Sequence, residues 1–296
     1  MANRVRFALG AAVFLLISPA QASAQEEAIV NAQTQGEHAV LIDGTGTYSR
    51  QIATNSPVAQ ALFDQGLRLT WGYYFPEAYA SFQEALHHDP DNPMILWGMA
   101  LAASPNPNSR HNGFPDDPEA AGRAAISRAN DLSEGLSGKD RQLVEALYVR
   151  YDSAKLSDLA QRDAAYLEAA RDLVEEYPDD PDIVSVFADA SMIMSPWNYW
   201  NDSGVPTQAV AEAIGYLERS LTQNPDHPGT NHLYMHIMES SPHPERALPS
   251  ANRLEGLMPR VGHMVHMPSH IYVRTGDYAR SIESNRRSLI ADDYFT

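Results

Sequence analysis

The chain shows a helical pattern of apolar and polar positions from Pro57 onward. Apolar and small residues recur four positions apart, as in Leu62 with Gly66 and Ala78 with Phe82. This spacing places them on one helix face, and the small residues let two antiparallel helices approach closely. We therefore expect an all-α fold of about six antiparallel helix pairs, near residues 57–88, 93–133, 138–176, 181–222, 228–256 and 262–290.

A tetrapeptide of the form Pro-Asp-x-Pro separates many of these segments. Aspartate can cap the N-terminus of the next helix, and proline suits its first turn. We interpret the tetrapeptides as turns and not as calcium loops, because they lack the glycine and the final glutamate of such a loop. They occupy residues 90–93, 115–118, 178–181 and 225–228.

The N-terminus has the pattern of a secretory signal peptide. Arg4 and Arg6 precede an apolar run over residues 7–17, and small residues at 22–24 form a cleavage site. This arrangement predicts a signal peptide over residues 1–24 and a mature protein in a bacterial periplasm or outside the cell. No later apolar run reaches transmembrane length, so we expect no membrane association after cleavage.

The remaining chain divides into two regions. Residues 25–56 carry no sustained pattern, which predicts a poorly ordered N-terminal segment, whereas residues 57–296 form one helical repeat domain. No polar capping helix follows the last predicted pair, so we expect either pairing through that end or truncation of a longer protein.

Composition argues against binding to nucleic acid or anionic lipid, and it excludes cysteine chemistry. The net charge is −17, and removing the signal peptide takes away two arginines, so the mature surface repels nucleic acid and anionic lipid. The chain has no cysteine, which excludes disulfides and thiolate ligands.

Histidines are concentrated near the C-terminus: seven of the eleven lie between residues 227 and 270. His232 and His236 are four positions apart, and His263, His266 and His270 are three and four apart. Each set therefore lies on one face of a helix. His232 and His266 are 34 positions apart, as are His236 and His270. That period equals one tetratricopeptide repeat.

The repeat pattern over about residues 57–290 resembles the tetratricopeptide superfamily. The C-terminal segments also look like those of a group of secreted bacterial tetratricopeptide proteins. The resemblance implies a right-handed superhelix whose concave groove is lined by the first helix of each pair, with ligand contacts at its second, fifth, ninth and twelfth residues. The segments that carry it are Asn231-His232-x-x-x-His236-x-x-Glu239, Pro244-Glu245-Arg246-Ala247-Leu248 and Gly262-His263-x-x-His266-Met267-Pro268-Ser269-His270.

These positions predict a cluster of metal ligands in the groove. One row across the groove contains Asp189, His236 and His270, and the next contains Ser185, His232 and His266. Histidine with carboxylate and no thiolate suits zinc, iron, manganese, nickel or copper(II). The candidate ligands are His232, His236, Glu239, His263, His266, His270 and Asp189.

Two functions fit this pattern. The first is an exported scaffold whose groove binds a peptide, a protein or a small molecule, with a metal ion in repeats five and six. The second is a metal-dependent enzyme, a hydrolase or an oxidoreductase, that uses the same cluster. A groove lined with histidines that bind no metal is the simpler alternative. An aromatic loop at residues 195–204 is either a lid over the groove or a packing element.

Overall fold

The computed structural model describes residues 39–108 and 115–293, and the regular elements there are helical apart from one isolated bridge between Trp200 and Pro206. The predicted all-α class is therefore confirmed for this part of the chain. The predicted signal peptide lies outside it. The α-helices are α2 (Pro57–Trp71), α3 (Phe75–His88), α4 (Pro93–Ala102), α5 (Pro118–Asp131), α6 (Gly138–Tyr151), α7 (Leu159–Glu176), α8 (Pro181–Ile193), α9 (Gln208–Gln223), α10 (Pro228–Glu239), α11 (Leu248–Leu257), α12 (Gly262–His266), α13 (Pro268–Arg274) and α14 (Tyr278–Asp292), with 3₁₀ turns at Ser133–Gly135 and Pro244–Ala247.

The proline turns set the helix starts as predicted, and an aspartate caps two of the four helices. Helices α4, α5, α8 and α10 each begin at the second proline of a Pro-Asp-x-Pro turn. The N-cap is the third residue of each turn, which is Asp117 before α5 and Asp180 before α8. The Asn92 and Asp180 side chains accept backbone N–H bonds, and the His227 ring does the same. The third residue takes this role because it directly precedes the proline at the first helical position.

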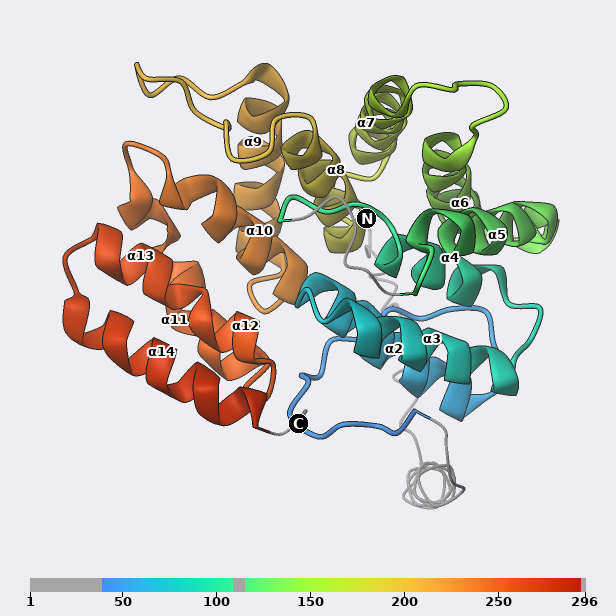
Figure 1. The fold of residues 1–296 in the computed structure, drawn as a ribbon, viewed down its shortest axis with the longest axis horizontal. Coiled ribbons are helices and arrows are strands. Elements are labelled where there is room, and N and C mark those ends of the chain that lie inside the picture. Colours follow the sequence, from blue (N-terminus) through green and yellow to red (C-terminus); the bar gives the residue numbers. More distant parts are fainter. Residues whose placement is uncertain (1–38, 109–114, 294–296) are drawn as a thin grey trace, which may run out of the picture.

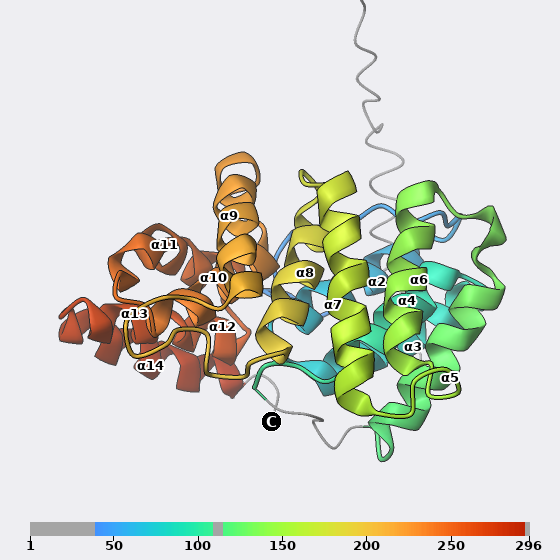
Figure 2. The same cartoon turned by 90° about the horizontal axis from the view of Figure 1, so that it is seen from above.

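Helices pack in chain order, each against its neighbours (Figure 1). Figure 2 shows α6, α7, α8 and α9 standing side by side, as their contacts also indicate. Small residues permit the closest approaches: a Cβ atom on Gly66 would lie 2.8 Å from the Phe82 ring, and one on Gly98 would lie 2.5 Å from it. Such distances are too short for any side chain, so these glycines let α2 and α4 pack against α3.

The two ends of the helical array meet. Helix α10 packs against α2 as well as against its neighbours in sequence. The backbone N–H of Gly262 donates to the Tyr74 hydroxyl over 2.9 Å, and this hydroxyl donates in turn to Asp292. Residues near 73 therefore lie beside residues near 235 and 263, which brings the first helix pair to the histidine-rich helices.

Residues 39–56 also differ from expectation, because they pack against the helices instead of lacking order. Arg50 is 7% exposed and donates to three carboxylates, those of Asp140, Asp180 and Asp182. A buried guanidinium needs such partners, so this segment is held to α6 and α8. The sequence pattern missed it because the segment is held by polar contacts and not by apolar periodicity.

Helix α12 ends at His266 and α13 begins at Pro268, the interruption that a proline within a helical pattern predicts. Proline cannot donate the backbone hydrogen bond that would continue the helix. Four methionines near the histidines pack in the core. They are Met235, Met238, Met264 and Met267, each 0% exposed.

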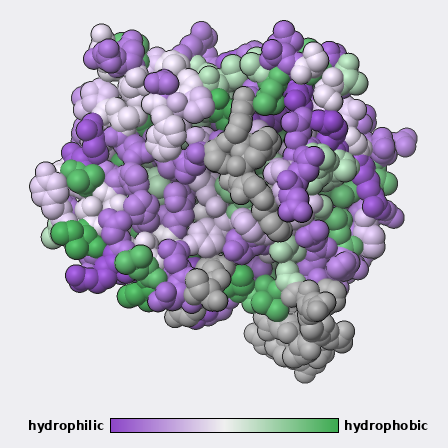
Figure 3. Space-filling view, viewed as in Figure 1, coloured by the Kyte–Doolittle hydropathy of each residue, from purple (hydrophilic) through white to green (hydrophobic). Residues whose placement is uncertain are grey.

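The surface is largely polar, with hydrophobic patches along α14 (Figure 3). Tyr278, Ile282, Leu289 and Ile290 of this helix are each more than half exposed. Among residues 39–108 and 115–293, no helix combines the length and apolar character needed to cross a membrane.

Candidate metal centre

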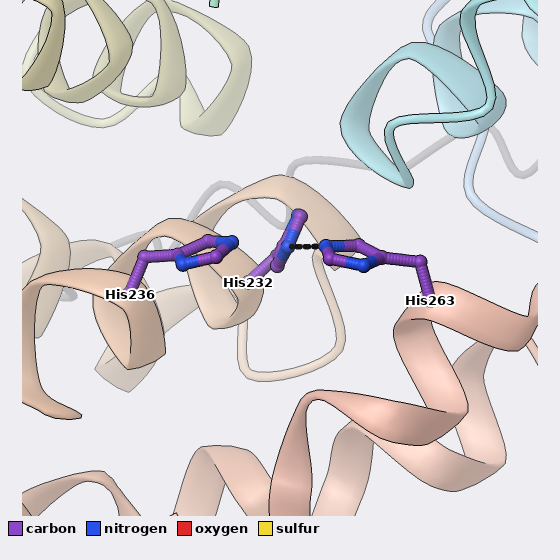
Figure 4. A group of neighbouring side chains, drawn as sticks. All are labelled: His232, His236 and His263. Carbon is purple, nitrogen blue, oxygen red and sulfur yellow. Dashed lines mark hydrogen bonds between the residues drawn. The ribbon is translucent and has the colours of Figure 1, made fainter. Parts of the chain in front are cut away.

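Three histidines from two helices converge at the junction of α10 and α12. His232 and His236 lie one turn apart on α10, and His263 is near the start of α12. One ring nitrogen from each lies within 4.8 Å of the other two. The Nε2 atoms of His232 and His263 are 3.0 Å apart, and Figure 4 shows His236 and His263 approaching His232 from opposite sides. This spacing suits three ligands of one metal ion.

The opposite ring nitrogens are held by hydrogen-bond acceptors. The Nδ1 atom of His232 lies 2.6 Å from the backbone oxygen of Trp71. A carbonyl oxygen can only accept, so Nδ1 carries the proton and Nε2 keeps its lone pair. The Nδ1 atom of His236 lies 3.4 Å from Glu239 Oε1, and its Nε2 has no hydrogen-bond partner among the described residues. Such outer partners orient histidine ligands in metal sites.

Burial keeps these imidazoles neutral. It lowers the pKa of His232 well below its usual range, and the neighbouring His236 and His263 lower it further. Burial, followed by the charge of His236, lowers the pKa of His263 to about 3. The pKa of His236 is also lowered, mainly by burial, although Glu239 opposes the shift. Neutral imidazole is the form that binds metal, so the rings are ready to ligate at neutral pH.

His266 and His270 form a neighbouring pair. Their Nε2 atoms are 2.8 Å apart. The Nδ1 atom of His270 lies 2.5 Å from Glu239 Oε2, and that of His266 lies 2.6 Å from Asn285 Oδ1. Burial would raise the pKa of Glu239, but its hydrogen bonds with His236 and His270 hold it at about 2. Glu239 was predicted as a ligand; the structure places its carboxylate on the outer nitrogens of two candidate ligands.

Asp189 is not part of the three-histidine group. The predicted row of Asp189, His236 and His270 is replaced by a different arrangement, in which His236 and His270 meet through Glu239. Burial raises the pKa of Asp189 to about 7, although the positive charge of Arg150 opposes the shift. In the second predicted row, His232 meets His263 instead of His266, whose ring faces Asn285 of α14 and His270 of α13.

Two aromatic residues cover the centre, and both have strained backbone. Among the described residues, Tyr73 and Trp197 are the non-glycine positions with positive φ, 59° and 63°. The Tyr73 ring stacks 5.7 Å from His236 and 5.5 Å from His263. The Trp197 ring lies edge-on to His236 at 5.7 Å. Left-handed backbone costs energy for a bulky residue, and such strain is concentrated at functional sites.

A buried polar cluster holds the α2 end of the site in place. Asp182 is 0% exposed and accepts from Tyr48, Arg50, Trp71 and His227. Burial would raise the pKa of Asp182, but hydrogen bonding and charge from His227 and Arg50 lower it below its usual range. The cluster joins the N-terminal segment, α2, α8 and α10, and thereby positions the Trp71 carbonyl against His232.

Sequence patterns did not identify Trp71, Tyr73 or Asn285 as parts of the site. Trp71 acts at the centre through its backbone oxygen, a group that every residue has. Tyr73 lies 159 positions before His232 in the chain. No local pattern reports a contact over such a distance. The sequence feature that could have drawn attention to this part of the site was Gly72, a residue typical of the tight turn that ends α2.

A cavity of about 450 Å³ lies beside the centre. Trp197 lines it and also contacts His236, while Asp163 lines another wall and pairs with Arg150 at 3.3 Å. In the aromatic loop at residues 195–204, Trp197 therefore contacts both the cavity and His236, whereas Tyr199 is 1% exposed and packs in the core. The full lining comprises Asn106, Pro107, Asn108, Ala160, Asp163, Ile193, Met194, Pro196 and Trp197.

Comparison with known proteins gives no assignment: no protein-family model matches the chain, and no curated protein matches it either. The resemblance to tetratricopeptide proteins stays a prediction from the sequence. The interpretation of the three histidines as a metal centre therefore depends on their geometry, hydrogen bonding and burial.

Proposed function

We propose that the protein is an exported scaffold of the tetratricopeptide type, a right-handed superhelix of about six helix pairs that binds a divalent transition-metal ion. His232, His236 and His263 are the proposed ligands. The 34-residue register and the packing of helices in chain order support the repeat architecture. The signal-like N-terminus supports export, and mature protein from the native host would then begin at Gln25.

The observation that carries the metal assignment is the convergence of three imidazole nitrogens within 4.8 Å of one another. Two of the rings have their outer nitrogens held by acceptors, which leaves lone pairs facing inward. Neutral histidines without thiolate suit zinc, iron, manganese, nickel or copper(II). A buried imidazole N–H needs an acceptor with or without a metal ion, so the convergence of the inward nitrogens is what favours an ion over a polar lining.

The ligand of the scaffold would enter on the concave side, through the cavity beneath Trp197. This cavity offers amide, carboxylate and aromatic groups, which suit a peptide, a protein segment or a small polar molecule. Nucleic acid and anionic membranes are disfavoured partners, because the net charge of −17 repels them.

Metal analysis of the purified chain, without a histidine tag, tests the centre. We expect at least one Zn²⁺ per chain and a melting temperature that rises with Zn²⁺, because the ion binds only the folded state. His236→Ala should weaken binding by at least about 10-fold. His243→Ala is the matched control, since this side chain is 65% exposed and pairs only with Glu245 among the described residues. A parent that binds no ion, or a His236→Ala variant that binds normally, contradicts the proposal.

A metal-dependent enzyme, a hydrolase or an oxidoreductase, is the second candidate. Three protein ligands leave one coordination position for water or substrate, the arrangement of catalytic zinc sites. Asp189 adds a carboxyl whose pKa of about 7 suits a general base, and its charge acts on Tyr73 beside the histidines. Turnover of ester, amide or phosphoester substrates that is lost in Asp189→Asn while Zn²⁺ still binds would establish this function.

A further inference from the structure

The five histidines of α10, α12 and α13 form a row of ring contacts, and the carboxylate of Glu239 contacts both ends of this row. From His236 through His232, His263 and His266 to His270, successive ring centroids are 4.7, 4.9, 6.3 and 4.7 Å apart. Glu239 contacts the first and last histidines of the row, with Oε1 on His236 and Oε2 on His270. The three-histidine group includes only part of the row, so the close approach of His266 and His270 needs a separate explanation.

The hydrogen bonds of Asn285 fix the proton position on His266. The Asn285 amide nitrogen donates to the Ser281 carbonyl over 2.9 Å, so the amide oxygen is the atom that faces His266 Nδ1 at 2.6 Å. An amide oxygen only accepts, and Nδ1 of His266 therefore carries the proton. Its Nε2 has a bare lone pair, which points at His270.

The same argument applies to His270. Its Nδ1 lies 2.5 Å from Glu239 Oε2, and an ionised carboxylate only accepts. In a neutral His270 ring, Nε2 is then bare as well. Two bare acceptor nitrogens 2.8 Å apart repel each other unless a cation lies between or beside them. The cation is either a shared proton or a metal ion.

Building on the proposed function, we infer that the centre binds two divalent ions, the first at His232, His236 and His263 and the second at His266 and His270. Glu239 supports both sites, because its two oxygens orient one ligand of each. The His270 side chain is 33% exposed, so water can complete the second coordination sphere. Two protein ligands with water give a weaker and more exchangeable site than the three buried histidines.

Zn²⁺ titration of the full chain, followed calorimetrically and by metal analysis after gel filtration, tests this inference. We expect two ions per chain, with the second bound at least tenfold more weakly than the first. The double variant His266→Ala/His270→Ala should bind one. The control His87→Ala/His88→Ala removes two histidines from α3 and should still bind two.

A Cu²⁺-loaded sample gives an independent readout that does not depend on stoichiometry. Two nearby Cu²⁺ ions couple magnetically, so the parent should show dipolar broadening in its EPR spectrum, and the His266→Ala/His270→Ala variant should show one isolated ion. Circular dichroism confirms that this variant folds. A parent that binds one ion with no coupling overturns the second site and leaves the first intact. A parent that binds none overturns both.

Discussion

Glu239 accepts hydrogen bonds from two imidazoles through a single carboxylate. Its two oxygens contact the Nδ1 atoms of His236 and His270, which lie on different helices. Each contact fixes a proton on Nδ1 and leaves Nε2 free for a metal ion. Glu239 therefore determines which ring nitrogens of His236 and His270 are available to bind a metal ion.

Glu239→Gln should weaken Zn²⁺ binding by about 10- to 100-fold with little change in fold. A carboxamide has one acceptor oxygen, so its NH₂ group must face one of the two rings, and that ring must move its proton to Nε2. Competition with a chromogenic chelator measures the affinity. The control is Glu245→Gln, which changes the exposed partner of His243. Equal affinities for Glu239→Gln and the parent would show that the carboxylate does not orient the ligands.

Asp189 should make the free energy of unfolding fall as the pH rises from about 4 to about 7. Burial raises its folded pKa to about 7, so over this range the unfolded carboxyl is ionised while the folded one still holds its proton, and stability is lost. Asp189→Asn should be more stable than the parent at pH 9, by at most about 4 kcal/mol, and the difference should close as the pH falls towards 4. Urea unfolding at several pH values measures this difference.

The exposed Asp226→Asn serves as control for Asp189→Asn and should show no such trend. Because Asp189 lies outside the three-histidine group, its variant should also keep the Zn²⁺ affinity of the parent. Loss of Zn²⁺ binding would return Asp189 to the ligand set that the sequence predicted.

The segment between α8 and α9 connects two helices and also covers the centre. Trp200 anchors it by donating from Nε1 to the Ile237 carbonyl over 2.8 Å, and Trp197 projects against His236. The Trp197 side chain is nevertheless 52% exposed, so it contributes little to the core. Within the segment, Tyr199 is buried in the core and Trp197 contacts the histidines.

Trp197→Ala should speed release of Zn²⁺ to EDTA by about 3- to 10-fold, since it removes an aromatic contact of about 0.5–1.5 kcal/mol. The free energy of unfolding should change by less than about 1 kcal/mol because the ring is half exposed. Stopped-flow chelation measures the release rate. Val205→Ala, in the same segment and 56% exposed, should release Zn²⁺ at the parental rate. Identical rates for all three proteins would exclude a covering role.

The sequence predicted where helices begin and end better than it predicted the contacts between them. The proline turns gave the helix starts, and Pro268 gave the break between α12 and α13, because both depend on the local chemistry of the backbone. The pairing of His232 with His263 was not predicted, since it depends on where α11, α13 and α14 hold α12 relative to α10. Periodicity assigns residues to a helix face, but packing decides which residues on that face meet.

At the scale of the whole molecule, one buried carboxylate joins four distant segments. Asp182 accepts hydrogen bonds from Tyr48, Arg50, Trp71 and His227, and it is fully enclosed. Removing its charge leaves the Arg50 guanidinium buried with fewer partners. The Trp71 carbonyl, which orients His232, is held in place by the same cluster. Stability and metal binding are therefore linked through this residue.

Asp182→Asn should lower the free energy of unfolding by about 3–5 kcal/mol at pH 7. The folded pKa of Asp182 is lowered, so its stabilisation is complete above its unfolded pKa of about 3.9 and is lost as the pH falls below that value. The difference from the parent should therefore shrink at pH 3. Urea unfolding at both pH values measures it.

Asp91→Asn is the control for Asp182→Asn. It breaks an exposed pair with Arg128 and should cost less than about 1 kcal/mol at either pH. A loss in Asp182→Asn as small as that of the control would show that the buried cluster is not a source of stability.

The hydrogen bond from His232 to the Trp71 carbonyl has a consequence for the timing of metal loading. These residues are 161 positions apart, so His232 is held in its ligating orientation only after α2 and α10 have docked. A growing chain makes α2 long before α12 is synthesised, and at that stage it offers the ion no complete site. Zn²⁺ should thus be captured late, by nearly finished molecules. The zinc content of a preparation would then measure the fraction of its molecules that are correctly folded.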